Sequence, residues 1–135
     1  DVNNPADVAA AAALAPDVTL VVNNAGIAQP GGFLAADSEE VMHRMFETNV
    51  FGVLRVSKAF APILQANGGG ALLNVLSVAS WINGGELAAY SASKSAAWSL
   101  TNALRQAPAS GAVVPQAHPA GVLAWREAFM AAARS

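Results

Sequence analysis

Two short apolar runs, each followed by a long helical pattern, constrain the fold of this chain most strongly. Residues 18–22 are Val-Thr-Leu-Val-Val, and residues 71–76 are Ala-Leu-Leu-Asn-Val-Leu. Continuous rather than alternating hydrophobicity is typical of a strand that is covered on both faces, as in a parallel sheet. We therefore predict two buried parallel strands joined by a helical crossover.

Helical patterns surround these strands. They are expected over residues 6–14, about 39–65 and about 88–105, with a third strand over 112–114. Asn4 and Pro5 carry the cap and first-position signals of the first helix. Asp37 or Ser38 caps the second, which is interrupted near Thr48–Asn49. Strand, helix, strand, helix, strand in this order predicts an α/β fold with a parallel sheet.

Composition excludes several classes of protein. A chain of 135 residues holds one domain with one core, and 54% apolar residues are far too many for a disordered segment. The net charge of -2 is not concentrated in any basic block, so we expect neither nucleic acid nor a membrane as a partner. No run reaches the roughly 18 apolar residues of a membrane span. With no cysteine and no secretory signal, a cytoplasmic location is expected.

Tyr90 and Lys94 form the first candidate site. The spacing of four residues places both side chains on one face of the predicted helix. A phenol ordinarily ionises near pH 10, too high for good acid–base work at neutrality, and a nearby ammonium favours the phenolate. The alternative is an exposed helix pair without a role. Because the chain has a single tyrosine, a chance match is less plausible.

Ser77 and Asn49 are candidates whose sequence context leaves two interpretations open. Ser77 follows the second strand, where its hydroxyl would reach an oxygen that Tyr90 protonates, or it is an ordinary turn residue. Asn49 interrupts an apolar helix, either as a local kink or as a functional amide. Ser91 and Ser93 are interpreted as helix-surface or packing residues.

The first strand is followed directly by Asn23-Asn24-Ala25-Gly26. Asparagine side chains can fix a strand-end loop by bonding its backbone, and Gly26 permits close approach of a ligand. An ordinary asparagine-rich turn remains the alternative. The two histidines, His43 and His118, have no partner at ligand spacing, so no metal site is predicted.

Asn-Asn-Ala-Gly, Asn49, Ser77 and Tyr-x-x-x-Lys, in this order, resemble the central part of the short-chain dehydrogenase/reductase family. The likeness is dense from Asp1 to about Arg105. It implies a Rossmann-type doubly wound parallel sheet, here truncated to a single partial dinucleotide-binding domain over 1–135 with a divergent tail over 107–135. It also implies hydride transfer between NAD or NADP and a small-molecule alcohol or carbonyl.

The resemblance implies a role for each matching residue. Tyr90 would be the acid/base that exchanges a proton with the substrate oxygen, and Ser77 would hold that oxygen. Lys94 would favour the ionised phenol and bind the nicotinamide ribose. Asn49 would keep the helix bend open for a water that links Lys94 to solvent.

The same resemblance implies cofactor contacts at two further places. Asn23, Ala25 and Gly26 would shape the cofactor side of the crevice, and Asp1-Val2 is similar to the strand-end pair whose acid meets the adenine. The two long helices, about 39–65 and 88–105, would form a homo-oligomer interface with Phe51 and Trp98 as candidates.

The glycine-rich turn that cradles the pyrophosphate in the family does not occur in this sequence. A second interpretation therefore stands beside the oxidoreductase: a truncated, catalytically inactive member that acts only as a folded, self-associating domain.

Overall fold

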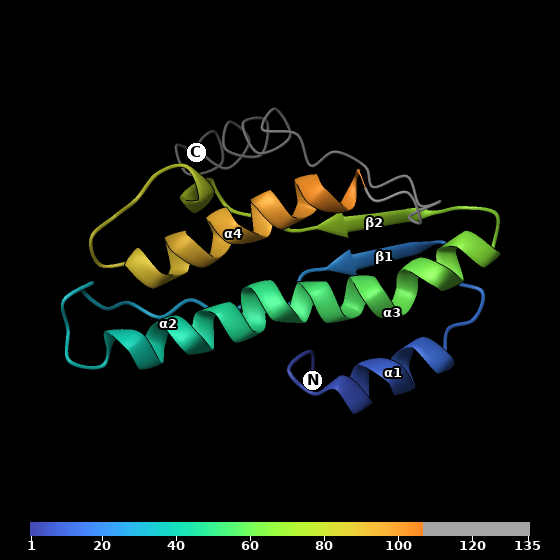
Figure 1. The fold of residues 1–135 in the computed structure, drawn as a ribbon, viewed down its shortest axis with the longest axis horizontal. Coiled ribbons are helices and arrows are strands. Elements are labelled where there is room, and N and C mark those ends of the chain that lie inside the picture. The colour runs from blue at the N-terminus through green and yellow to red at the C-terminus, as the bar shows by residue number, and fades with distance from the viewer. Residues whose placement is uncertain (107–135) are drawn as a thin grey trace, which may run out of the picture.

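The computed structural model describes residues 1–106, and the strand expected over 112–114 and the tail over 107–135 lie outside them. Figure 1 shows the order of the elements. They are α1 (Pro5–Ala13), β1 (Leu20–Asn23), α2 (Ser38–Phe46), the π-helical segment η1 (Glu47–Gly52), α3 (Val53–Ala66), β2 (Ala71–Asn74), the 3-10 turn η2 (Val78–Ser80) and α4 (Ala88–Leu104).

The two strands pair in parallel, as the sequence predicts, and their register runs from Leu20 opposite Ala71 to Asn23 opposite Asn74. Figure 1 shows the two strands side by side, with α3 and α4 running along them. Both strands end at asparagines, so two polar side chains meet at the carboxyl edge of the sheet.

One face of the sheet is buried under helices. Val21 of β1 and Leu72 of β2 form a core cluster with Leu64 of α3. On the same face, the Asn74 side chain donates to Thr101 of α4 at 2.9 Å. Helices α3 and α4 therefore reach the sheet from the same side, and α1 packs on α3.

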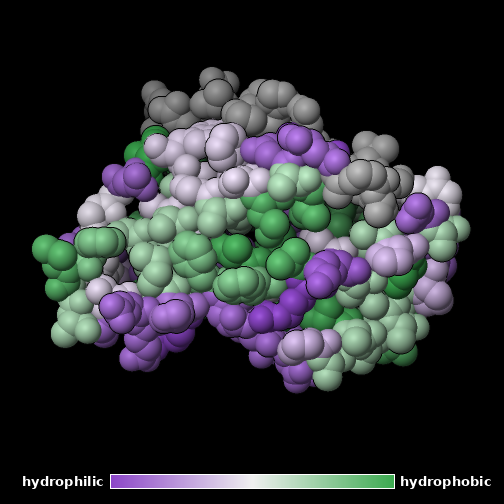
Figure 2. Space-filling model, in the orientation of Figure 1, coloured by the Kyte–Doolittle hydropathy of each residue, from purple (hydrophilic) through white to green (hydrophobic). Residues whose placement is uncertain are grey.

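The prediction that the first strand is covered on both faces is wrong for the described residues. The side chains of Leu20 and Val22 remain 55% and 48% exposed, while Val21 and Asn23 between them are buried. Within residues 1–106 the helices that contact the sheet lie on the Val21 side, so the opposite face lacks a cover there. Figure 2 shows hydrophobic residues across the centre of one molecular face.

The helix boundaries follow the expected signals closely. Asn4 caps α1 by accepting a hydrogen bond from the Ala6 amide at 2.9 Å, and Pro5 is its first residue. Asp37 occupies the cap position of α2, but its side chain makes no capping hydrogen bond. After α3, Gly68 and Gly69 have φ angles of 84° and 108°, a region that favours glycine and ends the helix.

The interruption predicted near Thr48–Asn49 is a six-residue π-helical segment between α2 and α3. Such segments widen a helix locally and free backbone groups from the regular ladder. Within the part of the chain that the structure describes, none of the helices has the length and hydrophobicity that crossing a bilayer requires.

Candidate active site

Asn49 joins three separate segments of the chain. Its Nδ2 donates to the carbonyl of Ile27 and to the hydroxyl of Ser93, and its Oδ1 accepts from the Ile27 amide, each at 2.9 Å. The side chain is only 1% exposed. Through these three hydrogen bonds Asn49 fixes the loop after β1 and the helix α4 to η1. Losing a buried amide with three partners would destabilise the fold.

The N-terminal residues reach the other side of η1. Asn3 donates to the Thr48 hydroxyl at 3.1 Å, and a Cβ atom on Gly52 would lie 2.9 Å from Cγ2 of Val2. Asp1 is exposed, and its carboxylate accepts from the Asn3 amide at 2.8 Å. Of the two segments expected to meet a cofactor, residues 1–2 lie beside η1. Residues 23–26 lead into the loop that Asn49 of η1 holds at Ile27.

Lys94 is buried beside Tyr90 on α4. Its Nζ donates to the carbonyl of Val75 at 3.1 Å and lies 5.9 Å from the centroid of the Tyr90 ring. Lys94 is 7% exposed, and burial lowers the pKa of its ammonium from the ordinary value of 10.5, because desolvation disfavours the charged form. The structure therefore places the cation over the Tyr90 ring, on the helix face that the four-residue spacing predicts.

Gly26 brings the loop after β1 close to Lys94. A Cβ atom built there would lie 3.2 Å from Asn49 Oδ1 and 3.4 Å from Lys94 Nζ. Only glycine therefore lets the loop approach Asn49 and the Lys94 ammonium this closely without a shift of either side chain. Ala25 is exposed in the same loop.

Ser77 lies between β2 and η2 and is partly buried. Its hydroxyl accepts a hydrogen bond from the Ala79 amide at 3.1 Å and so caps the 3-10 turn. Among the described residues no hydrogen bond joins Ser77 to Tyr90. Ser77 therefore acts as a turn residue, one of the two interpretations that the sequence allows. Its role in holding a substrate oxygen stays a prediction.

Asn23 points into the core beneath the site. Its Nδ2 donates to Asn74 Oδ1 at 2.8 Å and to the Ser57 hydroxyl at 3.4 Å. Asn74 in turn donates to Thr101. Asn23 therefore ties the ends of both strands to α3 and α4 from within and, unlike Gly26, lies in the protein interior.

Ser93 is the residue that sequence reasoning undervalued. It is fully buried, accepts from Asn49 and donates to the backbone carbonyl of Tyr90 at 2.8 Å. It is a packing residue, as one of the two interpretations held, but it also links the π-helical segment to the turn that carries Tyr90. Its position three residues after Tyr90 and directly before Lys94 was the available signal.

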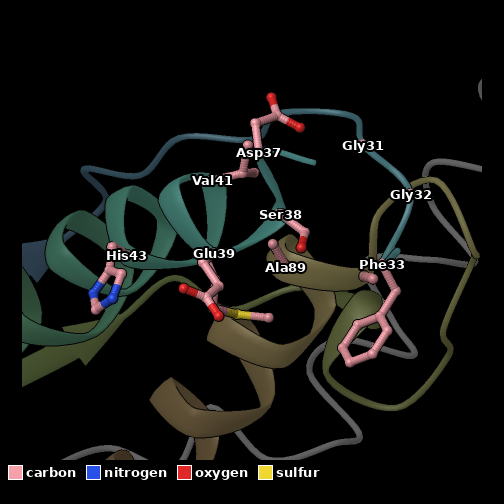
Figure 3. A pocket seen from close by; sticks show the side chains of 11 residues that line it. Gly31, Gly32, Phe33, Asp37, Ser38, Glu39, Val41, His43 and Ala89 are labelled. Atoms are coloured by element: carbon pink, nitrogen blue, oxygen red, sulfur yellow. The ribbon is translucent and has the colours of Figure 1, made fainter. Parts of the chain in front are cut away.

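A cavity of about 330 Å³ lies near the catalytic candidates but not among them. Figure 3 shows it between the first turns of α2 and α4, beside Gly31, Gly32 and Phe33. It reaches Ala89, the residue before Tyr90, whereas none of Asn49, Ser77, Tyr90 and Lys94 lines it. Within residues 1–106 no cluster of three histidine or acidic side chains suited to a metal ion is found, and His118 lies outside them.

The geometry brings together a buried cation, a phenol, a buried amide and a closely approaching glycine at the carboxyl edge of a parallel sheet. In open α/β sheets this edge is where ligands bind. A phenol can donate a proton to a bound oxygen atom and recover it. The site is thus suited to proton exchange with a bound oxygen atom.

Comparison with known proteins gives consistent matches. The family model described as short chain dehydrogenase matches residues 1–124. The chain is 40% identical over 96 residues to the uncharacterized oxidoreductase YusZ of Bacillus subtilis, covering 71% of this chain and 34% of that protein.

Two solved structures from Burkholderia cenocepacia are also similar. A short chain dehydrogenase in complex with NADP has a TM-score of 0.75 and 40% identity, over 82% of this chain and 47% of that one. A gluconate 5-dehydrogenase in complex with NADP and tartrate has a TM-score of 0.75 and 30% identity, over 83% and 45%. The chain thus spans about a third of the length of the curated relative and about half of each structure.

Proposed function

Because this chain belongs to the short-chain dehydrogenase family, we propose that it supplies the proton-transfer and nicotinamide-binding part of an oxidoreductase that interconverts an alcohol and a carbonyl compound. The observation that carries the proposal is the Lys94 ammonium, buried 5.9 Å from the Tyr90 ring and closely approached by the backbone at Gly26.

Tyr90 is the acid/base of the proposed reaction. In reduction its phenol gives a proton to the substrate oxygen, and in oxidation its phenolate takes that proton back. Lys94 stabilises the phenolate that remains after donation. Ser77 holds the substrate oxygen, and Asn49 keeps the loop and α4 in place. A reduced nicotinamide cofactor, held by Lys94, would supply the hydride for the carbonyl carbon.

Two features of the chain suit NAD or NADP. The Lys94 ammonium has three hydrogens and, within the described residues, donates one of them to Val75 O, so donors remain for ribose hydroxyls. Gly26 lets the backbone of the loop after β1 approach that ammonium closely, since a Cβ atom there would lie 3.4 Å from Lys94 Nζ. Asn23, Ala25 and the Asp1-Val2 pair complete the proposed cofactor side, Asn23 by fixing the strand end from inside the core.

The proposed substrate is a small molecule with an apolar portion. Trp81, Ile82 and Leu87, in the loop between η2 and α4, are 38%, 64% and 37% exposed. Exposed large apolar side chains next to a site favour contact with an apolar ligand. Ser77 would bind the hydroxyl or carbonyl oxygen of that ligand, and Tyr90 would exchange a proton with it.

The experiment is a titration of the protein with NADH and with NADPH, followed by nicotinamide fluorescence. We expect saturable binding of at least one, and loss of that binding in Gly26→Val, whose side chain would press on Asn49 Oδ1 and Lys94 Nζ and displace them. Gly32→Val is the control, because a Cβ atom at Gly32 has no neighbour within 4 Å. No saturable binding of either nucleotide would overturn the proposal and favour the non-catalytic, self-associating domain.

We also propose that copies of the chain associate through the surface of α2, η1, α3 and α4. Phe51 of η1 is 47% exposed, and Trp98 of α4 is partly buried. A large aromatic side chain left in water favours burial against a second copy.

A further inference from the structure

Two serines tie the turn after β2 to helix α4. The Ser80 hydroxyl donates to the backbone carbonyl of Lys94 at 3.1 Å, and the Ser95 hydroxyl donates to the backbone carbonyl of Ser80 at 2.8 Å. Ser80 is 8% exposed and Ser95 is partly buried. The two hydrogen bonds run in opposite directions between the same pair of segments, so they fix the separation and the orientation of η2 on α4 together.

Tryptophan packing reinforces this contact. Trp81, the residue after Ser80, meets Trp98 of α4 edge to face, with ring centroids 6.4 Å apart and planes at 87°. Edge-to-face pairs at this distance are favourable. The contact between η2 and α4 is therefore held by two kinds of interaction, the serine hydrogen bonds and the indole pair.

The positions of these residues connect the contact to the proposed chemistry. Ser77 is the cap of the three-residue turn η2, and Ser80 is the last residue of the same turn. Ser95 directly follows Lys94, which is one helical turn after Tyr90. Since no hydrogen bond joins Ser77 to Tyr90 in the described residues, the relative placement of their hydroxyls depends on how η2 docks on α4.

We infer that Ser80 and Ser95 are positioning residues: their reciprocal hydrogen bonds hold the Ser77 hydroxyl at the distance from Tyr90 that substrate binding and proton transfer require. The inference rests on the proposed function, and it adds two residues that touch neither cofactor nor substrate. A misplacement of catalytic groups by a fraction of an ångström slows the chemical step more than it weakens cofactor binding.

The test compares Ser95→Val with Ser95→Thr. The two introduced side chains have the same shape, and only threonine keeps the hydroxyl that donates to Ser80 O. Ser99→Val is the control on the exposed side of the same helix. Each variant is assayed for the Kd of NADPH, for kcat on a panel of aliphatic, aromatic and steroid ketones, and for the circular-dichroism exciton signal of the Trp81–Trp98 pair.

We expect Ser95→Val to lower kcat about fivefold, the effect of one hydrogen bond, with an unchanged Kd of NADPH and a weaker exciton signal. Ser95→Thr and Ser99→Val should match the wild type. Equal kcat in the valine and threonine variants would overturn the inference, as would an unchanged exciton signal in Ser95→Val. The exciton signal reports how η2 packs on α4 even when no substrate is turned over. A wild type that reduces none of the ketones would therefore count against the proposed function, and an unchanged exciton signal in Ser95→Val would count against the inference.

Discussion

Asn49 shows how a single side chain can organise a site without being exposed to solvent. Its amide satisfies both backbone groups of Ile27 and the hydroxyl of Ser93, so the loop after β1 and helix α4 share one anchor. Lys94 and Gly26 lie on those two segments, and their close approach depends on that anchor. The geometry at Lys94 is therefore set by a residue that need not contact any ligand.

Replacing Asn49 with alanine removes this anchor. We expect Asn49→Ala to lower the free energy of unfolding by about 2 kcal/mol, because the amide and carbonyl of Ile27 lose their partner. Urea unfolding measures the change. Asn24→Ala is the matched control, since Asn24 is exposed and its side chain makes no hydrogen bond among the described residues. Equal losses in the two variants would contradict the role given to Asn49.

Burial of Lys94 gives the protein a defined pH dependence. Because desolvation lowers the pKa of its ammonium below 10.5, the unfolded chain binds more protons than the folded chain between the lowered value and 10.5. The free energy of unfolding of the wild type relative to Lys94→Met should therefore rise with pH across that window and level off above it. Urea unfolding at a series of pH values tests this; a difference that stays constant or falls would refute it.

At the scale of elements, the π-helical segment η1 is the structural centre of the candidate site. Its residues contact the N-terminal segment through Thr48 and Gly52, and the loop after β1 and α4 through Asn49. Arg55 in the first turn of α3 adds a hydrogen bond to Val2 O at 3.3 Å and an ion pair with Glu47. A regular helix would present these residues in a different rotation, so the bulge determines which segments meet.

Gly52 tests the contact between η1 and the N-terminal segment. We expect Gly52→Ala to cost about 1–3 kcal/mol of stability by overpacking, because the new Cβ meets Val2 Cγ2 at 2.9 Å. In a Val2→Ala background the same substitution should cost much less. Gly84→Ala, where a Cβ has no neighbour within 4 Å, is the control. A cost that is the same in the wild-type background and in the Val2→Ala background would show that the two residues do not touch.

The sequence predicted the elements well, and their local surroundings less well. Parallel strands, the helix interruption at Thr48–Asn49 and the Tyr90–Lys94 pair follow from periodicity and spacing, which are local properties. The exposure of Leu20 and Val22 and the burial of Ser93 depend on which segments pack together, and a single sequence does not encode that visibly. For the same reason, the sequence does not predict the hydrogen bonds of Ser80 to the Lys94 carbonyl and of Ser95 to the Ser80 carbonyl.

At the scale of the whole molecule, the described helices that contact the sheet share one side of it. The Val21 and Leu72 side is covered by α3 and α4, while Leu20 and Val22 stay exposed on the other. Large apolar side chains are also exposed on η1 and in the loop before α2, including Phe51 at 47% and Leu34 at 92%. Such a distribution favours association of the chain with other apolar surfaces.

A substitution at Phe51 distinguishes association through the long helices from non-specific hydrophobic association. We expect the wild type to sediment as an oligomer at micromolar concentration and Phe51→Arg to shift it toward monomer, since a buried charge opposes the interface. Leu34→Arg should leave the sedimentation profile unchanged, although Leu34 is the more exposed of the two. If the wild type is a clean monomer, or if only Leu34→Arg disperses it, the proposed helix surface is wrong.

The most direct measurement of the central claim is the kcat of Tyr90→Phe on a ketone that the wild type reduces, with the Kd of NADPH determined alongside. The variant keeps the aromatic ring beside Lys94 and lacks only the proton donor. The account predicts a loss of about a hundredfold or more in kcat with little change in Kd. A Tyr90→Phe variant that reduces the ketone as fast as the wild type would contradict the claim that Tyr90 is the acid/base.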